Sequence, residues 1–377
     1  MRSSTLRRIG LCAMLLTVVV GTLSTSIPSA DAAVPAGPKK LERITSTLHR
    51  AARASNSQAP MAYHGGVSGV AVNVGAPKVY VVFWGSQWGR ATRNGQGYLT
   101  FANDPRRMAP ILQRLYAGLG TAGERWSNVL TEYCQAPGLA VGATSCNGVS
   151  GAQFIPNPTN GVLAGVWYDN GSLQPSHRTT CTDGVAHQCM TGPSGNALAA
   201  EALRAETHFG LNSNAALRNA QIVIVSPPGA HPDGFDLTLM NGGGDFCAWH
   251  DYTGSIAYSR ARSNNPGTRT VAFTNLPYIP DAGSACGANY VSAFRDGITI
   301  VASHEYAETI TDQYPEYIAG GWFDDGSTGN EVSDACSWGA DVNSGGAGAG
   351  PVTLSTGTFA LEANWSNAAD HCVLESP

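Results

Sequence analysis

The stretch of sequence that decides the fold is DGITIVASHEYAETITDQYP, residues 296 to 315. It predicts the longest helix of the chain, because Asp296 is a residue type that favours helix N-termini and Pro315 stops a helix. At 3.6 residues per turn, His304 and Glu308 stand one above the other, and Asp312 extends the same row by one turn. The remaining surface is largely apolar. We therefore expect a buried helix that carries an imidazole and two carboxylates into the core.

Titratable groups on a buried helix face need a partner, because an unpaired buried charge costs several kcal/mol or more. A divalent cation is one such partner. The string His304-Glu305-x-x-Glu308 resembles the His-Glu-x-x-His helix of zinc peptidases and differs from it only in the second ligand. In that pattern the glutamate after the first histidine is the general base. The resemblance implies that His304 and Glu308 are metal ligands and that Glu305 is the catalytic base.

A second acidic segment, Gly329-Asn330-Glu331-Val332-Ser333-Asp334, follows downstream. It is similar to the segment that gives thermolysin-like peptidases a glutamate ligand and an orienting aspartate, although the spacing here is one residue tighter. The resemblance implies that Glu331 is the third ligand and that Asp334 orients His304 through its free ring nitrogen. Asp312 is the alternative third ligand.

The ligand types set the expectation for the metal. Two carboxylates and one neutral imidazole cancel the charge of a divalent ion, so the bound water would be less acidic than in a site with two histidines. Zn²⁺ is the expected ion, and such oxygen-rich ligation also lets Mn²⁺ or Ca²⁺ compete.

His250 is a further candidate catalytic residue. It lies next to Trp249 and close to Cys247 in the sequence, where it could donate a hydrogen bond to a developing oxyanion. The alternative is a histidine that is satisfied within a strand.

The sequence lacks the motifs of several other enzyme classes. It contains no Gly-x-Ser-x-Gly elbow, no P-loop and no Gly-x-Gly-x-x-Gly segment. A metal-dependent, peptidase-like hydrolase is therefore the expected function. The alternative is a non-catalytic extracellular protein in which His304, Glu308 and Glu331 form a structural ion site or a buried polar cluster.

The first residues predict secretion. Arg2, Arg7 and Arg8 precede an apolar run from Ile9 to Val20, and small residues follow up to Ala32. This is the layout of a cleavable signal peptide, so we assign residues 1–32 to it and expect an extracellular protein. Residues 33–60 are interpreted as a linker or short pro-segment, and residues 61–377 as one secreted α+β domain.

Charge and hydropathy limit the partners. The chain has 22 basic and 27 acidic residues, a balance that disfavours nucleic acid. After residue 32 no apolar run reaches the ~20 residues that span a bilayer, so no membrane segment is expected. A protein or peptide is the expected substrate, and association with a cell wall is possible for an extracellular protein of this kind.

Eight of the nine cysteines follow the predicted signal peptide. An even number in an oxidising compartment predicts four disulfides, for which 105 pairings exist. Short separations in the sequence favour Cys134 with Cys146 and Cys181 with Cys189. The cysteines that remain are then paired as Cys247 with Cys286 and Cys336 with Cys372.

The rest of the chain predicts a mixed β-sheet flanked by helices, stabilised by these disulfides. Runs rich in β-branched and aromatic residues indicate strands at Lys78–Trp84, Ala220–Ser226, Phe246–Tyr252 and Thr270–Tyr278. Helices are expected at Pro105–Leu119 and Asn196–Phe209. Tyr133–Thr191 is dense in Gly, Pro, Asn and Cys, which predicts loops and short strands. One helix carrying two ligands beneath such a sheet is the zincin arrangement.

Landmarks along most of the chain resemble the secreted EXORDIUM-like, or phosphate-induced protein 1, family, known from plants with bacterial members. The matching segments are Tyr63-His64-Gly65-Gly66, Val79 to Gly85, Phe246-Cys247-Ala248-Trp249-His250, Cys286-Gly287, His304-Glu305-Tyr306-Ala307-Glu308, and Glu331-Val332-Ser333-Asp334-Ala335-Cys336. The resemblance implies an extracellular protein associated with growth promotion, and it implies no settled enzymatic activity.

Overall fold

The computed structural model describes residues 60–171, 173, 178–180, 188–191, 195–231, 235, 246–255, 270–316, 319–325, 330–337 and 348–376. All described residues belong to one compact unit, Gly37–Pro377. The signal peptide assigned to residues 1–32 lies outside the described residues, as does all of the 33–60 segment except Pro60. Both assignments therefore remain predictions.

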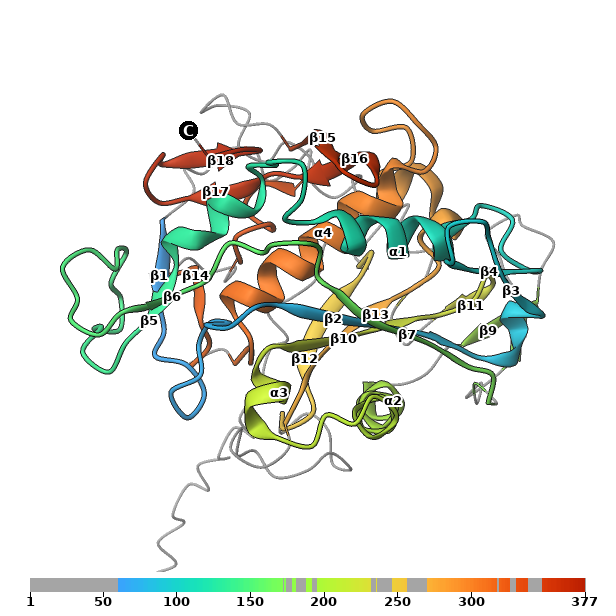
Figure 1. Ribbon diagram of the computed structural model, residues 1–377, viewed down its shortest axis with the longest axis horizontal. Helices are drawn as coiled ribbons and strands as arrows, with labels where there is room; N and C mark the ends of the chain where they lie inside the picture. The colour runs from blue at the N-terminus through green and yellow to red at the C-terminus, as the bar shows by residue number, and fades with distance from the viewer. Residues whose placement is uncertain are drawn as a thin grey trace, which may run out of the picture. The chain divides into compact units, whose positions relative to one another are not determined.

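A five-stranded mixed sheet forms the centre of the fold (Figure 1). Its order is β12 (Trp249–Tyr252), β13 (Ala272–Leu276), β10 (Ala220–Val225), β2 (Lys78–Trp84) and β7 (Leu163–Asp169). The last four are parallel, and β12 pairs antiparallel with β13 at the edge. Strands β10 and β2 are almost continuously apolar and buried, as expected for parallel strands covered on both faces. The predicted mixed sheet is confirmed.

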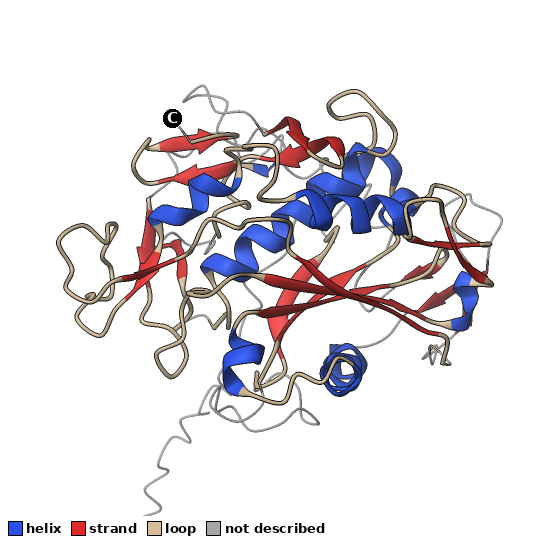
Figure 2. Ribbon diagram, viewed as in Figure 1, coloured by secondary structure: helices blue, strands red, loops and turns tan. Residues whose placement is uncertain are grey.

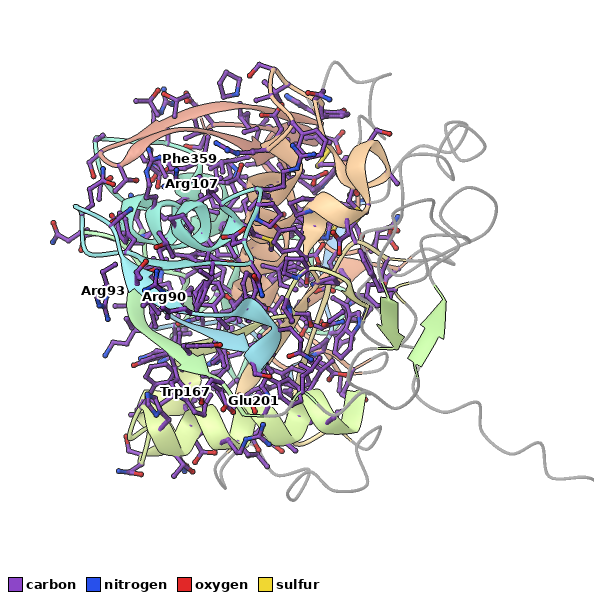
Figure 3. All side chains as sticks on the ribbon, turned by 90° about the vertical axis from the view of Figure 1, so that its right-hand side faces the viewer. Arg90, Arg93, Arg107, Trp167, Glu201 and Phe359 are labelled. Atoms are coloured by element: carbon purple, nitrogen blue, oxygen red, sulfur yellow. A yellow bond between two sulfur atoms is a disulfide. The ribbon has the colours of Figure 1, made fainter. Side chains whose placement is uncertain are left out.

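Helices cover both faces of this sheet (Figure 2). α1 (Met108–Gly118) and α4 (Asp296–Thr311) pack on one face, and α2 (Gly195–His208) lies on the other, with the short α3 (Asn214–Arg218) preceding β10. In Figure 3 the labelled Trp167 of β7 lies beside α2, where its ring stacks on His208 with centroids 4.2 Å apart. The predicted flanking helices are confirmed.

Helix α4 is enclosed between two β layers. The central sheet lies on one side, and the hairpin of β15 (Ala349–Leu354) and β16 (Gly357–Glu362) packs against the other. All 16 residues of the helix are buried. Its polar side chains therefore enter the core together with its apolar ones, which is the property that makes a site possible here.

The remaining elements are short connections between these layers. They are the paired strands β1 (Met61–Tyr63) with β14 (Trp322–Asp324), β3 (Ala91–Arg93) with β4 (Leu99–Phe101), β5 (Cys134–Gln135) with β6 (Gln153–Phe154), β17 (Asn364–Ser366) with β18 (His371–Val373), and the sheet of β11 (Ala230–His231), β9 (Gln188–Thr191) and β8 (Arg178–Thr180). The described residues also contain 3₁₀ turns: η2 (Ser86–Trp88), η3 (Ser127–Glu132), η4 (Ile279–Asp281) and η5 (Gly283–Cys286).

The ends of α4 differ from the prediction. Asp296 is its first residue and not its cap, because its Oδ2 accepts hydrogen bonds from the preceding loop, at the backbone N–H groups of Val291, Ser292 and Ala293. The helix ends at Thr311, three residues before Tyr314. Asp312 leaves the helical conformation with φ −137°. The predicted extension of the polar row to Asp312 is therefore wrong.

The stretch predicted as loops and short strands contains a seven-residue strand of the central sheet, β7. Its side chains are mostly half-buried, because it is the edge strand next to β2. Its Gly165 lies under Phe209 and Tyr80, where a Cβ atom would collide with both rings. β7 therefore lacks the continuous run of β-branched residues that identifies the inner strands, because it lies at the edge of the sheet and requires a glycine.

Three of the four predicted disulfides are confirmed: Cys134–Cys146, Cys247–Cys286 and Cys336–Cys372. The fourth involves Cys181, which lies outside the described residues. Several disulfides are consistent with an extracellular protein. Cys247–Cys286 ties the start of β12 to η5, shortly before α4, and Cys336–Cys372 ties the segment after Glu331 to β18.

Replacing Cys336 and Cys372 together with serine is expected to lower the free energy of unfolding. Their bridge closes a loop with a sequence separation of 36 residues, for which the chain-entropy relation gives about 4 kcal/mol. Denaturant unfolding of the oxidised wild type and the double variant would measure it. A difference below about 1 kcal/mol would show that this bridge does not hold the 330–337 segment in place.

Candidate metal centre

Four separate elements bring their polar side chains together around α4. The helix supplies His304 and Glu308, β12 supplies His250, the 330–337 segment supplies Glu331 and Asp334, and the end of β16 supplies Glu362. The antiparallel edge strand β12 contacts α4 directly. The cluster therefore depends on the tertiary fold as well as on the helical spacing.

The first group of ligand atoms surrounds the imidazole of His304. Its Nε2 lies 3.0 Å from Oε1 of Glu308 and 3.7 Å from Oδ1 of Asp334. The backbone N–H of Asp334 also donates a hydrogen bond of 3.0 Å to Oε1 of Glu308. One nitrogen and two carboxylate oxygens thus lie within 4.8 Å of one another.

The second group surrounds the imidazole of His250. Its Nε2 lies 3.2 Å from Oε2 of Glu331 and 3.8 Å from Oε2 of Glu308. These ligand atoms also lie within 4.8 Å of one another. Each group has the nitrogen and oxygen ligands that divalent transition metals accept, so these buried His/Glu triads could hold a metal ion.

The orientation of His304 comes from a residue that the sequence did not identify. Nδ1 of His304 faces Oε2 of Glu362 at 3.6 Å, whereas Asp334, expected in that position, lies on the Nε2 side. Glu362 therefore lies where the orienting carboxylate of a metal-bound histidine lies. The only signal for it in the sequence is an acidic residue directly after the apolar run Phe359-Ala360-Leu361.

The predicted third ligand is placed differently from the expected triad. Glu331 lies beside His250, and Asp334 completes the group around His304. Asp312 belongs to neither group: its Oδ1 accepts a hydrogen bond from the backbone N–H of Gly321. The structure thus brings together His304, Glu308, Glu331, Asp334 and His250, while their roles as ligands remain predictions.

The surroundings of the two histidines shift their pKa values in opposite directions. Burial lowers the pKa of His250 well below its usual value, and the neighbouring His304 lowers it further. Burial would also lower the pKa of His304, but the carboxylates of Glu308 and Glu362 outweigh it and raise that pKa well above the usual value. His250 is therefore neutral at physiological pH, which is the form that binds metals.

Glu305 is fully buried next to the cluster. Neither of its carboxylate oxygens has a hydrogen-bond partner among the described residues. Burial raises its pKa well above the usual value, an effect that His304 opposes and the carboxylate of Glu308 reinforces. A buried carboxyl group with a raised pKa beside a candidate metal site is a candidate general acid or base.

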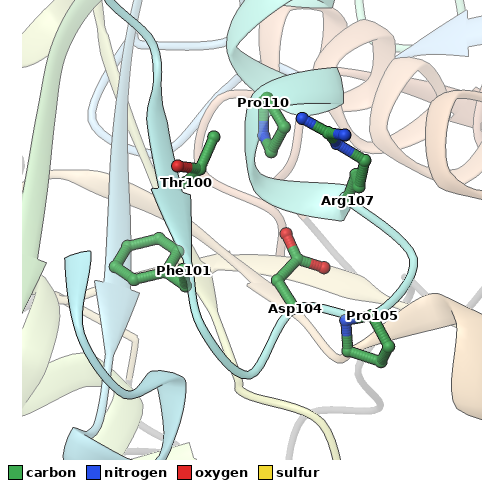
Figure 4. Close-up of a pocket in the computed structure, with 6 residues that line it drawn as sticks. All are labelled: Thr100, Phe101, Asp104, Pro105, Arg107 and Pro110. Atoms are coloured by element: carbon green, nitrogen blue, oxygen red, sulfur yellow. The ribbon is translucent and has the colours of Figure 1, made fainter. Parts of the chain in front are cut away.

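Access to the cluster is limited to one side. Asp334 is 9% exposed, whereas His250, His304, Glu308 and Glu331 are completely buried. A surface cavity of about 360 Å³ lies elsewhere, beside the start of α1 (Figure 4). The carboxylate in that cavity, Asp104, accepts hydrogen bonds from the backbone N–H groups of Met108 and Ala109 at the start of α1. Its role there is structural.

None of the helices in the described part of the chain is both long enough and apolar enough to cross a membrane. In comparisons of this chain with protein-family models, with curated proteins and with solved structures, nothing matches.

Proposed function

We propose that this protein is a secreted, metal-dependent hydrolase of the peptidase type, with its centre at the α4 cluster and Glu305 as the general base. The observation that supports this most strongly is the pair of His/carboxylate groups that meet at Glu308 in the closed core. Among the described residues Glu308 forms ion pairs only with histidines. A divalent cation would compensate the negative charge of the buried carboxylates, which the histidines alone do not balance.

The donor set fits a divalent ion. Each group offers three protein ligands, one imidazole nitrogen and two carboxylate oxygens. Catalytic zinc sites also have three protein ligands, which leaves a fourth position for water or substrate. When bound, the ion would polarise a carbonyl oxygen and lower the pKa of a water molecule. Zn²⁺ is the proposed ion, and the excess of carboxylates also suits Mn²⁺.

The chain's own residues supply the remaining parts of a hydrolytic site. Glu305 would hold the proton taken from the attacking water on its carboxylate and then donate it to the leaving amine. Glu362 would orient His304 through Nδ1. A protein or peptide remains the proposed substrate, since the resemblance of the helix is to peptidases.

A second candidate function rests on the burial of the cluster. Structural metal sites are closed, whereas catalytic sites keep an open position, and four of the five candidate ligands are completely buried. A non-catalytic extracellular protein with a structural ion site would have this property, and the EXORDIUM-like resemblance implies no settled enzymatic activity. The two functions differ at Glu305, which a structural site does not require.

Glu305→Gln separates them. The variant is expected to keep its metal content and its thermal midpoint, because glutamine has the same shape and removes a buried carboxylate without a hydrogen-bond partner. Peptide hydrolysis by the metal-loaded protein, screened on a broad peptide library, is expected to fall on the order of 100-fold or more, as for the loss of a general base. Asp370→Asn, a substitution at an exposed position with φ 59° where asparagine is well tolerated, is the control. Wild-type hydrolysis in Glu305→Gln would contradict the proposed base.

A further inference from the structure

The two oxygens of Glu308 face different imidazoles. Oε1 lies 3.0 Å from Nε2 of His304, and Oε2 lies 3.8 Å from Nε2 of His250. Oε2 is fully buried and makes no hydrogen bond within the described part of the chain. Oε2 therefore points into the His250 group and accepts no hydrogen bond there. A cation bound in this group would compensate its charge.

Glu308 takes part in both groups of three candidate ligands, and each group has two further residues of its own. His304 and Asp334 accompany one group, and His250 and Glu331 accompany the other, while Glu308 is common to both. One carboxylate between two sets of one imidazole and one carboxylate is the ligand arrangement of two-metal sites, in which the ions lie about 3.5–4 Å apart. A mononuclear site would leave one histidine and one carboxylate without a role.

The charge balance favours two ions over one. Glu308, Glu331 and Asp334 carry three negative charges when ionised, and Glu362 adds a fourth beside His304. One divalent ion would leave two of these charges uncompensated in a closed core, whereas two divalent ions balance all four. Uncompensated buried charge is the most costly state for such a cluster.

We propose that the α4 cluster is a dinuclear metal site, in which Glu308 bridges one ion held by His304 and Asp334 and a second ion held by His250 and Glu331. This inference rests on the proposed function, because it requires that the cluster bind metal. It identifies His250 as a metal ligand in place of the oxyanion donor expected from the sequence. With both ions bound, the site would stabilise the attacking and the leaving atoms of a hydrolysis together.

Metal stoichiometry tests the proposal directly. The full-length secreted chain, stripped with a chelator, reloaded with Zn²⁺ and desalted, is expected to contain two zinc ions per chain by inductively coupled plasma mass spectrometry. One ion per chain would overturn the dinuclear site and leave the proposed function intact. No bound zinc would overturn both.

Variants on the two sides show whether the ions occupy the two groups. His250→Ala and Asp334→Asn are each expected to reduce the content from two ions to one, and Asp370→Asn is expected to keep two. Glu331→Gln provides a second variant on the His250 side if His250→Ala does not fold. Loss of both ions, or of neither, in all folded single variants would overturn the assignment of separate groups.

The bridge itself has a spectroscopic readout that does not depend on activity. In wild-type protein loaded with Mn²⁺, two ions bridged by Glu308 are expected to give the exchange-coupled electron paramagnetic resonance spectrum of a manganese pair. In His250→Ala the spectrum of isolated Mn²⁺ is expected. An uncoupled spectrum in wild-type protein that contains two Mn²⁺ ions would overturn the bridging role.

Discussion

Replacing Glu308 with glutamine is expected to abolish metal binding at both positions of the α4 cluster. An amide cannot provide the two anionic oxygens that face His304 and His250, so the affinity for Zn²⁺ should fall on the order of 100-fold or more, which corresponds to about 2.8 kcal/mol. Isothermal titration of the metal-free protein with Zn²⁺ would measure the loss. No other single substitution in the cluster is expected to affect both groups.

The fold of the Glu308→Gln variant serves as its internal control. Without metal, glutamine removes a buried negative charge and keeps the volume of the side chain, so the metal-free variant should unfold at a temperature no lower than the metal-free wild type. Asp370→Asn, at an exposed position, should bind Zn²⁺ as the wild type does. A Glu308→Gln protein that binds Zn²⁺ with wild-type affinity would show that the cluster is not the metal site.

Removing the metal from the wild-type protein is expected to lower its thermal midpoint. An ion present at a thousandfold excess over its dissociation constant stabilises the folded state by about 4 kcal/mol, which corresponds to about 6 °C for a domain of this size. Differential scanning fluorimetry with and without EDTA, in oxidising buffer that keeps the disulfides intact, would measure the shift. Readdition of Zn²⁺ should restore the midpoint.

The Glu308→Gln variant is also the matched control for the chelation experiment. It should unfold at the same temperature with and without EDTA, because it has no bound metal to lose. If the wild type loses its metal to EDTA and its thermal midpoint does not change, protons compensate the carboxylates of the metal-free cluster, and the expected stabilisation by the ion is wrong.

The helix at the centre of this account could be predicted from the sequence, because its signal is local. The spacing of His304 and Glu308 requires only helical geometry, and the apolar residues around them require burial. The inner strands β2 and β10 were predicted for the same reason, since parallel strands covered on both faces are continuous runs of apolar residues. Of the three confirmed disulfides, Cys134–Cys146 was predicted from its short sequence separation, and the other two were the pairs that remained.

The partners of the helix could not be predicted in the same way. The contact between His250 and Glu331 depends on β12 joining the sheet antiparallel at its edge, next to α4. The contact between His304 and Glu362 depends on the β15–β16 hairpin covering the opposite side of the helix. Neither contact can be predicted from the spacing of residues along the chain, because each joins elements that are far apart in the sequence.

Two local errors have physical causes. Asp312 was placed on the helix because the sequence has no glycine or proline between Gly297 and Pro315. The backbone leaves the helix at Asp312, whose carboxylate accepts a hydrogen bond from the backbone N–H of Gly321. β7 was read as part of a loop region because edge strands lack a continuous apolar run. In both cases tertiary contacts decide the structure against the local pattern.

Anomalous X-ray diffraction from crystals of the protein, purified without chelators and measured on both sides of the zinc absorption edge, tests the central claim most directly. The account predicts edge-dependent peaks at about 2.0–2.2 Å from Nε2 of His304 and from the carboxylate of Glu308, with a second peak beside Nε2 of His250. Absence of any anomalous peak in the cluster at the edges of zinc and manganese, with the imidazoles hydrogen-bonded directly to the carboxylates, would contradict it.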